Sequence, residues 1–202
     1  MNSIIENIKS RRSVRSYLDE EVPKDLIEEI VEAGRYAPSA LNKQPWEFII
    51  ITNKGLIREL SGVIREITKR ILIMAPILRW FNRQLRDEST ISAIRKTATS
   101  REDTVFYDAP VIIFIVSNQL DPWVEINCAL AAQNMMLAAH SLGLGSCFIG
   151  RAILLSKDKR SSKKLGLKKG YKIYAALIFG YPREFPKKFP SRRKDNLICW
   201  KE

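Results

Sequence analysis

The sequence of 202 residues predicts a single α+β domain. Strand-like apolar runs and helical stretches follow one another in an irregular order, unlike the regular β-α-β succession of a doubly wound sheet. The clearest strand is Ala109 to Ser117, a run of β-branched and aromatic residues typical of a central strand buried on both faces. The chain also lacks GxGxxG after a strand and GxxxxGK(S/T), so the usual dinucleotide and P-loop signatures are absent.

Two helices are expected before Pro38. "SIIE" at Ser3 to Glu6 has the spacing of a capping box, so the first helix begins there and ends near the arginines of "RRSVR". The second begins around Pro23, which suits a first helical turn. Its apolar face consists of Leu26, Ile27, Ile30, Val31 and Ala33. Its glutamates, Glu28, Glu29 and Glu32, are interpreted as a solvated face rather than an acid–base pair.

The loop "APSALNKQPW" leads into "EFIIIT", which has the pattern of a buried strand. Residues 54–108 are helical in composition and rich in arginine, and their apolar run Ile71 to Phe81 is interrupted by Pro76. Glu125 to Gly150 contains a long helix rich in Ala, Leu and Met that stops at Gly143 and Gly145. A helix apolar nearly all round belongs at the centre of a fold or in a subunit interface.

The C-terminal third contains one more core strand, Lys172 to Pro182, and a polar tail with a strand-like ending at Asn196 to Trp200. His140 is the single histidine, so a multi-histidine metal site within one chain is excluded. We expect this histidine to be structural, since it stands apart from any nucleophile motif.

Composition indicates an ordinary globular chain, 46% hydrophobic and 28% charged. Three cysteines with no CxxC pair favour a reduced, cytoplasmic setting. No secretory signal and no membrane span are expected, because polar residues interrupt every long apolar run. The net charge of +12 predicts weak, salt-sensitive attraction to polyanions. No nucleic-acid module is recognisable, so no specific nucleic-acid partner is expected.

Four separated segments carry the functional prediction: "RRSVR" at 11–15, "APSALNKQPW" at 37–46, "GLGSCFIG" at 143–150 and "PSRRKDNL" at 190–197. In order and character they resemble the nitroreductase family of FMN-dependent oxidoreductases. The likeness covers residues 3–52 and 109–198. The resemblance implies a homodimer with a central, mostly antiparallel sheet flanked by helices and a C-terminal strand exchanged between subunits. It implies one nitroreductase-like FMN-binding domain over residues 1–202, with one FMN at each of two sites across the dimer interface.

By the same resemblance, "RRSxR" holds the phosphate and part of the flavin. Arg11 and Ser13 would lie at the phosphate, and Arg15 toward the ribityl chain and the N1/O2 edge of the ring. Arg12 is part of the segment but falls at a variable family position, so we expect its side chain to be exposed and nearly dispensable. Guanidinium groups suit this task because they bind phosphate through bidentate, charge-assisted hydrogen bonds.

The remaining implied cofactor contacts come from three other places. The "PSxxN" turn of the partner subunit would line the flavin with Pro38, Ser39, Ala40 and Asn42. The segment along the ring face would be Phe148, Ile149 and Gly150, with a backbone N–H near N5. The late basic residue that returns to the phosphate is Arg193, alone or together with Arg192. The alignment of the tail is open by one residue, because Asp195 stands where the commoner family form has proline. Trp46 is expected in the core rather than on the flavin.

The implied activity is a ping-pong oxidoreductase reaction. NAD(P)H gives hydride to flavin N5 and leaves, and a small-molecule acceptor such as a nitroaromatic or a quinone then takes electrons at the same face. No side chain is expected to act as acid, base or nucleophile, because the flavin carries the chemistry. Residues 55–108 are the variable helical segment. Within it, Ile71 to Phe81 and the nearby arginines form either a substrate lid or an ordinary packed helix pair.

Two alternatives remain open from the sequence. The same fold supports other flavin reactions, such as dehalogenation, azoline oxidation or flavin destruction, and an assay panel of reductants and acceptors separates them. A non-enzymatic basic protein that binds nucleic acid or an acidic membrane is the second. It would be colourless and would bind DNA in a salt-dependent way.

Overall fold

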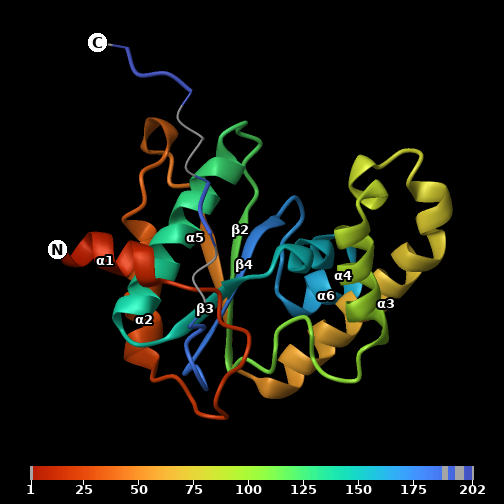
Figure 1. The fold of residues 1–202 in the computed structure, drawn as a ribbon, viewed down its shortest axis with the longest axis horizontal. Coiled ribbons are helices and arrows are strands. Elements are labelled where there is room, and N and C mark those ends of the chain that lie inside the picture. Colours follow the sequence, from red (N-terminus) through yellow and green to blue (C-terminus); the bar gives the residue numbers. More distant parts are fainter. Residues whose placement is uncertain (1, 188–190, 194–197, 202) are drawn as a thin grey trace.

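A four-stranded sheet lies between two layers of helices in this computed structural model (Figure 1), which describes residues 2–187, 191–193 and 198–201. The strands are β1 (Glu47–Ile51), β2 (Val111–Ser117), β3 (Gly145–Phe148) and β4 (Lys172–Gly180). Their order is β1-β2-β4-β3 and every neighbouring pair is antiparallel. The expected α+β class with an antiparallel sheet is therefore confirmed.

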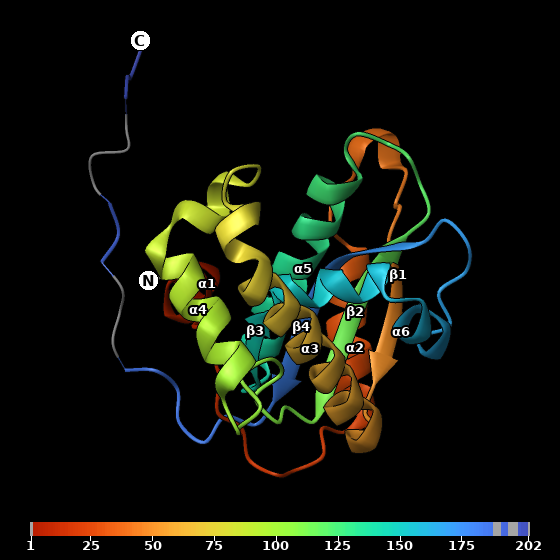
Figure 2. The same ribbon diagram turned by 90° about the vertical axis from the view of Figure 1, so that its right-hand side faces the viewer.

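Six α-helices and three 3₁₀ helices surround the sheet within the described residues. The α-helices are α1 (Ser3–Ser10), α2 (Lys24–Arg35), α3 (Lys54–Leu78), α4 (Glu88–Thr99), α5 (Val124–Ser141) and α6 (Lys159–Lys164). The 3₁₀ helices are η1 (Ala40–Asn42), η2 (Arg83–Arg86) and η3 (Gly150–Lys157). Figure 2 shows α3 and α4 in front of one face of the sheet, while α2 and α5 lie behind the other. No helix in these described ranges is long and apolar enough to cross a bilayer.

β2 is buried along its whole length because the sheet separates two hydrophobic clusters. Its even-numbered residues, such as Phe114, pack toward α3, whereas odd-numbered residues, such as Ile113, pack toward α2 and α5. This alternation follows from the two-residue period of a strand. The prediction of a central strand buried on both faces is confirmed.

β1 differs from the fully buried strand that the sequence predicted. It lies at the edge of the sheet and pairs only with β2, so Glu47 and Ile50 are exposed while Ile51 is buried. Trp46, just before it, is buried in the cluster with α2 and α5, as expected.

Two helix boundaries also differ from the sequence interpretation. Asn2, rather than Ser3, caps α1, because its Oδ1 accepts a hydrogen bond from the N–H of Ile4 at 2.9 Å. α3 continues through Pro76 to Leu78 without the predicted break. Proline removes only its own N–H bond, and Pro76 lies two residues from the helix end with its ring exposed. The glutamates of α2 face solvent, as expected.

The long apolar helix α5 packs against α2 and against the sheet, and Cys128, Ala131 and Met135 are buried in this interface. Burial raises the pKa of the Cys128 thiol to about 12. The opposite side of α5 leaves Ile126 and Leu130 exposed. The helix thus lies at the centre of the fold and also presents an uncovered apolar face.

The C-terminal tail first follows the domain after β4, where the Arg183 N–H donates to the Ser16 carbonyl at 3.1 Å, and its end lies away from the body (Figure 1). Ile198 and Trp200 are exposed, and Ile198 to Trp200 form no strand within this chain. The rest of the predicted strand-like ending, Asn196 and Leu197, lies outside the described residues, as does Asp195.

Candidate functional site

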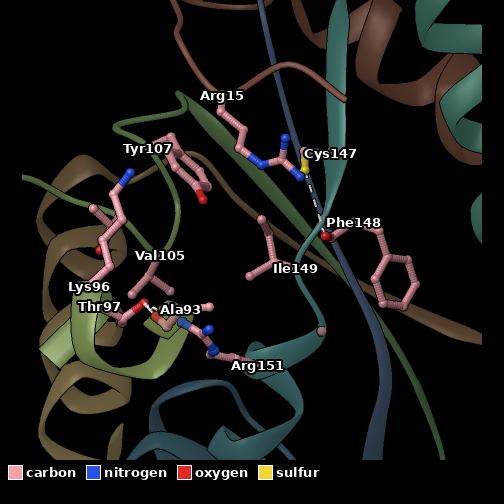
Figure 3. Close-up of a pocket in the computed structure, with 12 residues that line it drawn as sticks. Arg15, Ala93, Lys96, Thr97, Val105, Tyr107, Cys147, Phe148, Ile149 and Arg151 are labelled. Carbon is pink, nitrogen blue, oxygen red and sulfur yellow. Dashed lines mark hydrogen bonds between the residues drawn. The ribbon is translucent and has the colours of Figure 1, made fainter. Parts of the chain in front are cut away.

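A cavity of about 220 Å³ opens between α4, the loop before β2 and the end of β3 (Figure 3). It brings together residues from three regions that are far apart in sequence: Arg15, residues 93–107 and residues 147–151. The lining residues are Arg15, Ala93, Lys96, Thr97, Thr104, Val105, Tyr107, Cys147, Phe148, Ile149, Gly150 and Arg151. Of the predicted cofactor residues, this cavity contains Arg15 and the whole segment Phe148–Gly150.

The basic N-terminal segment reaches the cavity because it lies alongside β3. Ser13 forms a parallel bridge with Ser146, and the N–H of Val14 donates to the Ser146 carbonyl at 3.0 Å. The approach is so close that a Cβ at Gly145 would lie 2.8 Å from the Val14 side chain. Glycine at this position therefore lets the arginine segment dock on the strand.

Arg15 and Tyr107 form one side of the cavity. The Arg15 guanidinium lies 6.0 Å from the centre of the Tyr107 ring and extends toward Cys147 (Figure 3). Tyr107 itself has a φ of 57°, in the left-handed region that non-glycine residues rarely adopt. Burial raises the pKa of the Cys147 thiol, although the charges of Arg15 and Arg11 act in the opposite direction.

Arg11 is half-buried, and its Nη1 atom is buried with no hydrogen-bond partner among the described residues. Burial lowers the pKa of Arg11. The neighbouring Cys147 opposes this shift, while the positive charges of Arg12 and Arg192 reinforce it. The group nevertheless stays charged at neutral pH, because arginine starts from a very high pKa. An unpartnered, partly desolvated guanidinium is well suited to an anionic ligand.

Arg12 is buried, so the expectation of an exposed side chain is wrong. Only 8% of its surface is accessible. Its Nη1 donates to the carbonyls of Lys9 at 2.7 Å and Arg11 at 2.6 Å. These bonds satisfy carbonyls that the end of α1 leaves open, so the side chain turns back onto the helix.

The segment after β3 forms the opposite wall. Ile149 is buried, and its N–H donates to the Ala176 carbonyl at 2.8 Å, which extends the pairing of β3 with β4. Phe148 is partly exposed, and its ring is directed away from Tyr107 and Arg151 (Figure 3). A Cβ at Gly150 would meet no atom within 4 Å, so the packing of the chain itself does not require glycine there.

Five polar residues of the cavity were missed by the sequence interpretation: Lys96, Thr97, Thr104, Tyr107 and Arg151. Arg151 directly follows the predicted ring-face segment, and this adjacency could have identified it. The others come from residues 55–108, where no motif distinguishes them from neighbouring polar residues. The tertiary packing of α4 and of the loop between α4 and β2 brings them to the cavity.

The loop with Pro38, Ser39, Ala40 and Asn42 does not line this cavity within the chain. It lies near the start of α5, where the Ala40 N–H donates to Asn127 Oδ1 at 3.2 Å and Lys43 forms an ion pair with Asp121. Leu41, Asn42 and Gln44 have φ values of 53°, 54° and 44°. These conformations are costly for non-glycine residues and often mark functional loops.

The late arginines are only partly placed by the structure. Arg192 acts on the pKa of Arg11 through its charge, so it lies in the same electrostatic environment. Both Arg192 and Arg193 are exposed.

His140 lies beside α1 and the start of the C-terminal tail. The Phe185 ring contacts His140 edge-on with centroids 5.4 Å apart, and Ser10 Oγ lies 2.9 Å from His140 Nε2. His140 is therefore held by α1 and the tail, and it lies outside the cavity.

Comparison with known proteins gives a consistent result. Residues 8–181 match the model of the nitroreductase family. A protein of Methanothermobacter thermautotrophicus, provisionally named an NADH dehydrogenase/NAD(P)H nitroreductase, is 29% identical over 91% of this chain and 79% of its own length. The crystal structure of a nitroreductase with bound FMN from Bacteroides fragilis superposes with a TM-score of 0.79 at 28% identity, over the whole of both chains. A second nitroreductase with bound FMN, from Desulfitobacterium hafniense, gives 0.77 at 26% identity, also over both whole chains.

Proposed function

The chain belongs to the nitroreductase family, and from this premise we propose that it is an FMN-dependent oxidoreductase. In this proposal NAD(P)H is the reductant, and an electron-poor small molecule such as a nitroaromatic or a quinone is the acceptor. The two bind in turn at one open site, in a ping-pong cycle. The single observation that carries the proposal is the cavity between Arg15 and the Phe148–Gly150 segment, in a fold shared with nitroreductases solved with FMN.

The residues of this chain fit FMN at its phosphate end. The buried, unpartnered Nη1 of Arg11 is a donor that an incoming phosphate would satisfy. Ser13, on the same segment, would add a hydroxyl donor, and Arg192 or Arg193 would add charge from the tail. Arg192 already lies close enough to act on the pKa of Arg11. Arg12, which bonds back to α1, would position the segment rather than touch the phosphate.

The residues also fit a flat ring in the cavity. Bound FMN would supply the hydride-accepting and electron-donating chemistry that the side chains lack. Arg15 would place a positive charge where reduction adds negative charge, which favours the reduced form. The open space over Gly150 would let a ring lie against the backbone there. Val105 and the buried Ile149 would keep water from one side.

A homodimer is part of the proposal. Exposed apolar side chains lie on α1, at the end of α2, at the start and on the outer side of α5, and on the loop at 38–42. They are Ile4, Ile5, Ile8, Tyr36, Leu41, Trp123, Ile126 and Leu130. Apolar surface of this extent marks interaction sites. We propose that a second subunit covers it, that each 38–42 loop completes the partner's FMN site, and that the C-terminal tail adds a strand to the partner.

Residues 55–108 are proposed to control access of the acceptor. The end of α3 and the turn after it expose Ile73, Ile77, Trp80 and Phe81 to solvent. The other end of the same segment, at Lys96 and Thr97, lines the cavity. Residues 55–108 thus connect the exposed apolar side chains at the end of α3 to the wall of the cavity. A lid that closes on a flat acceptor is consistent with this arrangement.

The visible spectrum of the purified protein tests the proposal directly. Flavin bands near equimolar with the chain are expected, together with bleaching of these bands when NADH or NADPH is added without oxygen. Reoxidation by a nitroaromatic or a quinone completes the test. If the protein takes up no FMN, the proposal of an FMN-dependent oxidoreductase is wrong. A flavoprotein that neither nicotinamide bleaches contradicts only the assigned reductant.

A further inference from the structure

The end of the cavity opposite Arg15 is formed by Arg151 on one side and by α4 on the other (Figure 3). Arg151 is half-buried, and its Nη1 donates a hydrogen bond to Thr97 Oγ1. Thr97 is itself buried, and its hydroxyl donates to the Ala93 carbonyl at 3.1 Å. Because the threonine proton is committed to that carbonyl, its lone pair faces Arg151. The helix therefore holds the guanidinium in one orientation.

No carboxylate of the described residues forms an ion pair with Arg151. The lining of the cavity contains three cationic side chains, Arg15, Lys96 and Arg151, and no aspartate or glutamate. In the part of the chain that the structure describes, no carboxylate forms an ion pair with any of the three. Asp103 lies in the adjoining loop, but its Oδ1 accepts hydrogen bonds from Ser61 and from the backbone N–H groups of that loop.

A partly desolvated cation without a counter-ion is unfavourable by itself and becomes favourable when an anion binds. Thr97 engages one N–H of the guanidinium, and arginine has five in a planar fork. The remaining fork matches a carboxylate, which arginine binds through two parallel hydrogen bonds. The buried Oγ1 of Thr104, also in the cavity wall, has no partner among the described residues and adds a further polar contact.

We propose that Arg151 binds a carboxylate on the electron acceptor, so that the preferred acceptors are aromatic or quinoid compounds that carry a carboxylate group. This inference rests on the proposed function, because it places the acceptor over the segment that ends at Gly150. Arg151 is the next residue and lines the same cavity, so a carboxylate bound to it would belong to a molecule that lies over that segment. The phosphates of a nicotinamide cofactor lie farther from its ring, and Arg11 serves the FMN phosphate from another segment.

A matched pair of acceptors tests the assignment. 4-Nitrobenzoate carries the carboxylate, and 4-nitrobenzamide has nearly the same shape without the charge. The amide withdraws electrons more strongly, so intrinsic reactivity favours it, and the site must overcome that difference. For the holoenzyme we expect a kcat/KM at least about tenfold higher for the benzoate, since charge-assisted hydrogen bonds give discrimination of this order. Arg151→Gln should remove most of the preference, through KM.

Two further variants separate charge from folding. Arg151→Lys keeps the charge without the planar fork and should keep part of the preference. Arg95→Gln removes a cation from the exposed side of α4, the helix that carries Thr97. It should leave the ratio of kcat/KM for the two acceptors unchanged. FMN content and thermal midpoint are measured for each variant. KM for NADH and NADPH is measured in parallel. An Arg151→Gln change confined to these two reductants assigns the anion site to the nicotinamide and overturns the inference.

Binding without turnover provides the independent readout. Calorimetric titration of the protein with 4-nitrobenzoate should show binding that Arg151→Gln weakens about tenfold and Arg95→Gln does not. If the protein oxidises no nicotinamide but shows this pattern, the proposed function fails while the carboxylate site stands. An unchanged benzoate-to-benzamide ratio in Arg151→Gln with normal FMN content overturns the inference and leaves the oxidoreductase intact. Loss of FMN from that variant alone also overturns it, because Arg151 then holds the flavin.

Discussion

Single replacements of Arg11 and Arg12 should affect different properties, FMN affinity and stability respectively, although the two residues are adjacent and carry the same charge. Arg11 has a buried Nη1 without a partner, whereas Arg12 donates twice to carbonyls at the end of α1. We therefore expect Arg11→Ala to weaken FMN binding and Arg12→Ala to weaken the fold.

The magnitudes follow from the contacts. A hydrogen bond from a charged group contributes about 1.5–3 kcal/mol, so one lost phosphate contact weakens FMN about tenfold to a hundredfold in Arg11→Ala. The apoprotein of this variant should be at least as stable as the wild type. It loses a partly desolvated cation whose pKa is lowered by burial and by the charges of Arg12 and Arg192. Arg12→Ala loses two such bonds and leaves two carbonyls open, which lowers the free energy of unfolding by about 3–6 kcal/mol.

Two measurements on the same preparations check this. Urea unfolding of the apoproteins gives the stabilities, and quenching of flavin fluorescence during titration gives the FMN affinities. Arg95→Gln, on the exposed side of α4, controls for loss of one positive charge. The reasoning is refuted if Arg11→Ala binds FMN as tightly as the wild type. It is equally refuted if Arg12→Ala is as stable as the wild type.

Three further outcomes are expected. Gly145→Ala should lower the thermal midpoint and FMN retention together, because the added methyl would lie 2.8 Å from the neighbouring valine side chain and costs about 1–3 kcal/mol; unaltered values would show that the arginine segment docks elsewhere. Trp80→Ala and Phe81→Ala should change acceptor kinetics with normal FMN content, and unchanged kinetics would exclude the lid. At pH 8 a thiol reagent should react quickly only with the exposed Cys199. Cys128 and Cys147 are buried and their pKa values are raised, that of Cys128 to about 12, so both stay protonated at pH 8; a second thiol that reacts quickly would contradict this.

Local pattern was sufficient for much of the architecture. The continuous apolar run of β2 predicted burial on both faces, since no solvated position interrupts it. The 3.6-residue spacing of apolar side chains in α2 predicted which side faces the core. The sequence pattern was less informative about the position of a strand in the sheet, because that position depends on which other strands pair with it. "EFIII" has the composition of an inner strand, but β1 lies at the edge of the sheet. Pro76 suggested a break that α3 does not have.

The sequence by itself determined the family, because short spaced motifs encode local backbone and charge, and it pointed to Arg15 and Phe148–Gly150 in the candidate cavity. The individual contacts required the tertiary structure. It turned Arg12 onto α1 and buried it, although the resemblance predicted an exposed side chain at that variable position. It left Nη1 of Arg11 without a partner among the described residues. It also brought Arg151 together with Thr97, more than fifty positions earlier. This contact depends on α3, which packs against both α4 and η3, and such packing is the sum of many distant apolar contacts rather than a property of any one segment.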